Sequence, residues 1–215
     1  MGRRWVRMLA VVLIAIGMTG VQVSAQDATS VATPMADGTS AEAFCAQRGG
    51  VVRERTPFYG TNLDRSQWIQ TGESRLFCEF QHGAGSDDDS GIQIDLKSFA
   101  ANGPRLATVA YLAQVPIPDD LAPASANPAT SYCAYLGGTQ SWGGATSAAG
   151  GGWVTDDAST PYEIMDACVF PDGSMISAWG LTYHANGVVR GADLTQLLAW
   201  QPVPDEIPAI FPSGE

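Results

Sequence analysis

Positive charge is scarce in this chain. Lysine and arginine together number 11 among 215 residues, against 22 aspartate and glutamate residues, and the net charge is −11. Such an acidic chain repels phosphate backbones and anionic lipid headgroups, so we expect no nucleic-acid partner and no anionic membrane surface as partner. The hydrophobic content of 45% excludes a disordered chain, and the length allows one large domain or two small ones.

Catalytic signatures are also missing. The sequence has two histidines, no GxSxG nucleophile motif, no CxxC pair and no glycine-rich phosphate-binding fingerprint. The acidic run at residues 86–91 lacks the spacing of a calcium loop, and a solvated turn is favoured there over a metal site. We therefore expect neither a metal nor a cofactor.

Residues 1–25 are typical of a secretory signal peptide. Three arginines in residues 3–7 precede the apolar run Met8–Met18, and the small residues of Val23–Ala25 favour cleavage before Gln26. An N-terminal membrane anchor is the alternative, although the run is short for a membrane span. Cleavage removes three of the 11 basic residues and leaves a net charge of −14. No other stretch is long and apolar enough for a stable membrane span, so we expect a secreted, periplasmic or outer cell-envelope protein.

Four cysteines follow the signal, and in an oxidising compartment they predict two disulfides. Spacing alone allows three pairings, but an internal repeat favours one of them. Three segments of the first copy match three of the second in the same order: 43–50 with 131–138, 77–80 with 167–170, and 98–103 with 182–187. The repeat pairs each cysteine within its own copy, Cys45 with Cys78 and Cys133 with Cys168.

Each copy is predicted to contain a helix, about three antiparallel strands and a second helix. Ser40 and Asn127-Pro128 are suitable N-terminal caps for the first helix of each copy, and Gly49-Gly50 and Gly137-Gly138 end those helices. A hairpin turn at Pro171–Gly173 is expected to join strands 167–170 and 174–179.

The predicted fold class is α+β, as two tandem small domains with one internal disulfide each. The predicted organisation is a signal peptide (1–25), a disordered linker (26–40), a first repeat domain (41–115), a linker (116–126), a second repeat domain (127–200) and a proline-rich tail (201–215).

The second copy contains the pattern NPA…YC…GG…CVFPDGS…W between residue 127 and about residue 184. This pattern resembles a small bacterial exported domain of unknown function that is often labelled a hemolysin. The first copy resembles a diverged version, because it keeps Cys45, Gly49-Gly50 and Cys78 but lacks the PDGS turn and the tryptophan. The resemblance implies an exported, disulfide-bonded domain. It implies no established reaction and supplies no catalytic residues.

Three residues are candidates for binding. Trp142 and Trp153 flank a glycine-rich loop where an exposed indole could stack on a ligand, although packing inside the protein is the commoner fate of tryptophan. Trp179 follows the predicted hairpin and is expected in the core. His184 is the third candidate, and without a nucleophile motif or a triad partner it is favoured as a simple turn residue.

The leading interpretation is an exported, non-enzymatic protein that binds an extracellular or envelope protein or a glycan. The alternative is a membrane-active protein, as the family label suggests. The alternating stretch 92–97 is shorter than a membrane strand of about 9–11 residues, however, and the acidity is unfavourable near anionic lipid. A hydrolase that uses His184 or an acid pair is a third interpretation. A protease inhibitor would belong to the binding class, but no reactive loop is identifiable.

Overall fold

The computed structural model describes residues 38–81, 91–121, 127–140, 149–156 and 164–211. All of the described residues belong to one compact unit. The predicted signal peptide, most of the predicted linker that follows it, and Trp142 lie outside the described residues.

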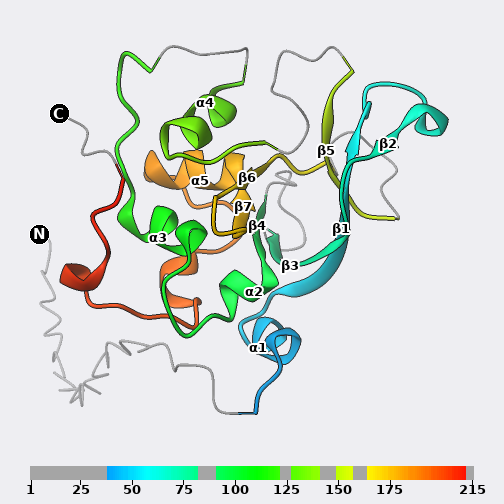
Figure 1. Cartoon of the computed structure of the whole chain (residues 1–215). Coiled ribbons are helices and arrows are strands. Elements are labelled where there is room, and N and C mark those ends of the chain that lie inside the picture. Colours follow the sequence, from blue (N-terminus) through cyan, green and yellow to red (C-terminus); the bar gives the residue numbers. More distant parts are fainter. Residues whose placement is uncertain (1–37, 82–90, 122–126, 141–148, 157–163, 212–215) are drawn as a thin grey trace, which may run out of the picture. The chain divides into compact units, whose positions relative to one another are not determined.

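The described residues form a mixed helical and antiparallel fold, which confirms the α+β class (Figure 1). The α-helices are α1 (Ala41–Gln47), α2 (Leu96–Phe99), α3 (Leu106–Ala113), α4 (Pro128–Tyr135) and α5 (Ala178–Ala185). The strands are β1 (Val51–Tyr59), β2 (Ile69–Gln70), β3 (Arg75–Gln81), β4 (Gly91–Asp95), β5 (Gly151–Val154), β6 (Ala167–Val169) and β7 (Met175–Ser177). Short 3₁₀ helices span Arg65–Gln67, Leu194–Gln196 and Pro204–Glu206.

One sheet contains strands from both predicted copies, in the order β2-β1-β3-β4-β7-β6, with β5 paired to β1 (Figure 1). The two halves meet where Ile94 of β4 lies opposite Ile176 of β7. Cys78 lies opposite Ile94 in the β3–β4 pair, and Cys168 lies opposite Ile176 in the β6–β7 pair. The strands of both halves therefore belong to one sheet, and the prediction of two tandem domains is not confirmed.

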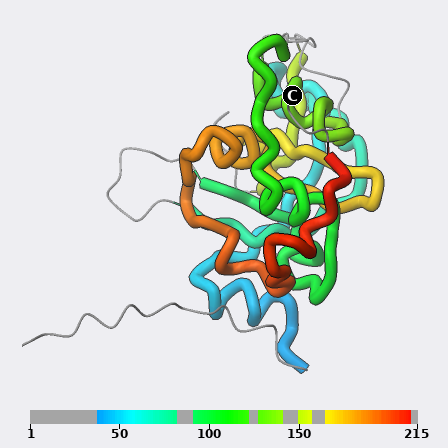
Figure 2. The backbone as a smooth tube through the Cα atoms, turned by 90° about the vertical axis from the view of Figure 1, so that its left-hand side faces the viewer, coloured from blue at the N-terminus to red at the C-terminus, as the bar shows by residue number. Residues whose placement is uncertain are grey.

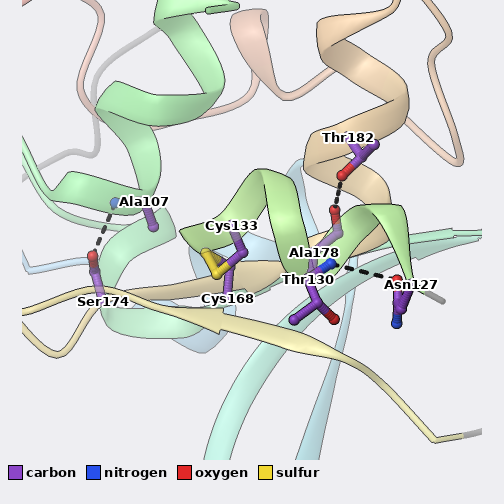
Figure 3. Close-up of a disulfide and its surroundings, with 8 residues drawn as sticks. All are labelled: Ala107, Asn127, Thr130, Cys133, Cys168, Ser174, Ala178 and Thr182. Carbon is purple, nitrogen blue, oxygen red and sulfur yellow. Dashed lines mark hydrogen bonds between the residues drawn. A yellow bond between two sulfur atoms is a disulfide. The ribbon is translucent and has the colours of Figure 1, made fainter. Parts of the chain in front are cut away.

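The two disulfides join Cys45 to Cys78 and Cys133 to Cys168, as the repeat predicts. Each links the first helix of its half to a strand of the sheet. Figure 3 shows the second disulfide between α4 and β6. Because all four cysteines are at most 1% exposed, the disulfides belong to the interior of the protein.

The Gly-Gly pairs end α1 and α4 as predicted, and the two glycines of each pair have different reasons to be there. Gly49 and Gly137 have positive φ angles of 83° and 78°, the left-handed conformation that glycine adopts most easily. Gly50 and Gly138 lie against the disulfides, where a side chain would meet both sulfur atoms. Local backbone geometry thus requires the first glycine, and close packing requires the second.

The main hydrophobic core combines side chains from both halves, including Phe99, Tyr132, Leu181 and Leu198. A smaller cluster contains Phe77, Trp153, Met165, Ala167 and Met175. The C-terminal segment, orange to red in Figure 2, returns to the main core: the Ala199 amide donates to the Phe99 carbonyl over 3.1 Å, and Phe211 packs against the ring of Phe170. Part of the predicted proline-rich tail therefore contributes to core packing.

Three predicted elements differ from the observed ones. The alternating stretch 92–97 is a strand only as far as Asp95, whose side chain accepts from the Ser98 amide and begins α2. The expected strand 174–179 ends at Ser177, because the Ser177 hydroxyl accepts a hydrogen bond from the Gly180 amide and begins α5. The expected second helix of the second copy is a single 3₁₀ turn. Its start is nevertheless as predicted, since Asp193 accepts from the Thr195 amide over 2.9 Å. Among the described residues, no helix has the length and apolar character needed to cross a membrane.

Candidate functional site

The candidate site begins with the exposed aromatic face of α5. Trp179 and Tyr183 are four residues apart and therefore lie on the same side of this helix. Their ring centroids are 5.8 Å apart, and the Arg190 guanidinium carbon lies 3.6 Å from the centroid of the Tyr183 ring. Trp179 remains 37% exposed. The indole of Trp179 is thus held by Tyr183 and by its hydrogen bond to Asp166 while part of it remains in contact with solvent.

Asp166 lies beside this aromatic face. Its backbone carbonyl accepts from the Ala178 amide over 2.7 Å, which holds Asp166 against the start of α5. Its carboxylate accepts from the Asn127 side-chain amide over 2.9 Å. Asn127 is also the N-cap of α4, where its side-chain oxygen accepts from the amides of Ala129 and Thr130; Figure 3 shows the second of these bonds. One asparagine therefore both begins a helix and orients the carboxylate.

The Asp166 carboxylate is poorly solvated. Burial raises its pKa above the ordinary aspartate value, although hydrogen bonding from Asn127 and Trp179 works in the opposite direction. No basic side chain of the described residues forms an ion pair with it, in contrast to Asp172, which lies 3.4 Å from Arg105, and Glu79, which pairs with Arg55. The site thus joins an exposed indole to a partly buried carboxylate that lacks a counter-charge within the described part of the chain.

Trp153, one of the two tryptophans named as binding candidates, is not part of this site, and its burial agrees with the packing alternative. Trp153 is only 3% exposed and packs edge-on against Phe77, with ring centroids 5.5 Å apart. It is buried because β5 pairs with β1, which places Trp153 opposite Pro57. Trp142 lies outside the described residues. Trp179, which the sequence analysis assigned to the core, is 37% exposed, so that assignment was wrong.

His184 is buried within the protein and is not a surface turn residue. Its ring stacks on Tyr111 with a centroid separation of 3.7 Å, and its Nε2 lies 2.9 Å from the Gln114 side-chain amide. Burial lowers its pKa, while Asp193 and the Tyr111 carbonyl favour the protonated form. At 4% exposure, His184 is not accessible to a substrate and serves as a packing residue.

A second polar group is the buried ion pair between Arg55 of β1 and Glu79 of β3. The Arg55 Nε lies 2.5 Å from Glu79 Oε1, and its Nη1 donates to the Trp153 carbonyl over 3.1 Å. The adjoining depression has a volume of about 180 Å³ and is lined by Gly49, Val51, Arg53, Glu79 and Gln81. This is smaller than a typical small-molecule site of roughly 300–1,000 Å³. We interpret the Arg55–Glu79 pair as a link between β1, β3 and β5.

Comparison with family models, with curated proteins and with solved structures finds no match to this chain.

The sequence contained a partial signal for the site. Asn127 and Trp179 belong to the NPA…W pattern of the second half, and the i, i+4 spacing of Trp179 and Tyr183 would have placed both on one helix face. Predicting a strand through residue 179 concealed this spacing. Asp166 offered no signal, because its approach to Asn127 depends on how α4 packs beside β6 and α5.

Proposed function

We propose that this chain is an exported binding protein without catalytic activity, and that its interaction surface is centred on Trp179. The observation that carries the proposal is the exposed, pre-positioned indole of Trp179 in contact with Tyr183. Exposed aromatic side chains with few rotatable bonds provide much of the energy of protein interfaces, since little conformational entropy is lost when they are covered. The two disulfides agree with folding in an oxidising compartment.

We further propose that residues 41–115 and 127–200 are copies of one ancestral unit joined through their β4 and β7 strands. The support is the equal register of the two halves. In each half the strand cysteine lies opposite an isoleucine, and these two isoleucines, Ile94 and Ile176, lie opposite each other. Under this proposal the two copies fold as one unit with a common core, so neither would be stable alone.

Crosslinking tests the proposed surface. The mature chain would be added to envelope and secreted fractions of the cells that produce it, then crosslinked at increasing concentration. We expect saturable capture of a defined partner, reduced at least tenfold by Trp179→Ala. Trp68→Ala is the matched control, because Trp68 is a partly exposed tryptophan that packs on Phe58, next to β2. Capture that does not saturate, or that is lost equally with both variants, would contradict the proposal.

A further inference from the structure

The described carboxylates differ in how their charge is balanced. Glu79 is paired with Arg55, and Asp172 lies within 3.4 Å of Arg105. Among the described residues, the side-chain hydrogen-bond partners of Asp166 are the neutral Asn127 amide and the Trp179 indole, and burial disfavours its charged form. A partly buried carboxylate without a cation is electrostatically costly, and the cost is relieved when a cation binds beside it.

The aromatic face adds a second attraction for a cation. A tryptophan ring carries negative charge density on its faces, and an ammonium or guanidinium group placed over it is attracted by that charge. The protein already uses this interaction within the site, since Arg190 lies over Tyr183 at 3.6 Å. The exposed part of Trp179 offers an equivalent ring beside the unbalanced Asp166 carboxylate.

We infer that the Trp179–Asp166 site receives a lysine or arginine side chain of a basic protein partner. This inference rests on the proposed binding function and specifies the chemistry of its ligand. The charge of the chain supports it, because a net charge of −14 after removal of the signal peptide draws basic partners toward the surface.

The first half of the chain does not repeat this site. Leu76 takes the position of Asp166 in the first half, because each lies two residues before the strand cysteine of its half. When the two halves are aligned at the helix caps Asp95 and Ser177, Lys97 takes the position of Trp179 in the first half. A lysine and a leucine provide neither the aromatic face nor the carboxylate. We therefore expect one cation site per chain, with a stoichiometry of one.

Titration of the mature chain with short capped peptides tests the inference. The probes are a lysine-containing pentapeptide and the same peptide with glutamine in place of lysine, and the readout is the NMR signal of the Trp179 indole N–H. The lysine peptide should give a saturable shift, and the glutamine peptide should bind at least tenfold more weakly. Asp166→Asn should weaken lysine-peptide binding at least tenfold. Asp64→Asn, which removes the same charge from an exposed residue, should change it less than twofold.

Three results would overturn the cation inference. They are equal shifts with the lysine and glutamine peptides, a stronger shift with a neutral oligosaccharide such as cellotetraose, and binding that is insensitive to 0.5 M salt. If Asp166→Asn strongly lowers the melting temperature, that variant no longer tests binding. The difference between the lysine and glutamine peptides and the salt dependence, both measured on the unmutated chain, then test the inference. The proposed function is tested separately by partner capture, and it is refuted if Trp179→Ala leaves capture unchanged. If capture depends on Trp179 but the lysine peptide is not preferred, only the inferred ligand chemistry is refuted.

Discussion

The second glycine of each Gly-Gly pair lies so close to a disulfide that adding one methyl group should destabilise the protein. A Cβ atom at Gly50 would lie 2.5 Å from the Cys78 sulfur and 2.8 Å from the Cys45 sulfur. A Cβ atom at Gly138 would similarly contact both sulfurs of the second disulfide. The sulfurs cannot move aside, because the disulfide joins a helix to a strand inside the core.

We expect Gly138→Ala to lower the free energy of unfolding by about 1–3 kcal/mol, the range for overpacking a core. Gly137→Ala is the matched control. Nothing lies within 4 Å of the position its methyl group would take, but its φ of +78° costs a non-glycine residue about 1–2 kcal/mol. Because the two expected losses overlap in size, the causes must be separated by removing the disulfide.

The disulfide-free background is the Cys133→Ala, Cys168→Ala double variant. Removing a crosslink between cysteines 35 residues apart should itself cost about 4 kcal/mol in the chain-entropy model. Without the two sulfurs, the closest remaining atom is the Cys133 carbonyl oxygen at 3.2 Å, so Gly138→Ala should cost much less, whereas the cost of Gly137→Ala should persist. The coupling between Gly138→Ala and the disulfide should therefore reach about 1–3 kcal/mol, and that of Gly137→Ala should stay below about 0.5 kcal/mol.

Urea unfolding followed by far-ultraviolet circular dichroism measures each variant. An equal loss for Gly138→Ala with and without the disulfide would refute the proposed contact. If the disulfide-free chain is too unstable for a folded baseline, the same cycle with Gly50→Ala and the Cys45–Cys78 bridge provides an independent measurement. Near-zero coupling there would also count against the packing argument.

Two further predictions concern buried ionisable groups. Burial holds the pKa of His184 below its ordinary value of 6.5, so the unfolded chain binds a proton before the folded chain does. The contribution of neutral His184 to the free energy of unfolding is fully present above about pH 6.5 and is lost as the pH falls through the folded-state pKa. His184→Gln should therefore reduce the loss of unfolding free energy between pH 7.5 and pH 5, measured by urea unfolding. An unchanged slope would contradict the assignment. Glu79→Gln leaves the Arg55 charge buried and should cost about 3–5 kcal/mol. Arg55→Met combined with Glu79→Leu should cost less in the same assay, and a greater loss for the double variant would refute the ion-pair argument.

The sequence by itself determined the features that depend on neighbouring residues. Ser40 and Asn127 begin their helices because their side-chain oxygens accept from backbone amides two or three residues away. The cysteine pairing followed from the repeated spacing. The Pro171–Gly173 turn followed from proline and glycine chemistry, and Gly173 has the expected positive φ of 76°.

The tertiary structure alone decided which tryptophan reaches the surface and how the candidate site is assembled. Trp153 is buried because its strand pairs with β1, nearly 100 residues earlier in the chain, whereas Trp179 is exposed because a helix begins at residue 178 and turns it outward. Asp166 meets Asn127 across 39 residues. Local propensity contains no information on such long-range contacts, since they depend on which surfaces of distant segments are complementary.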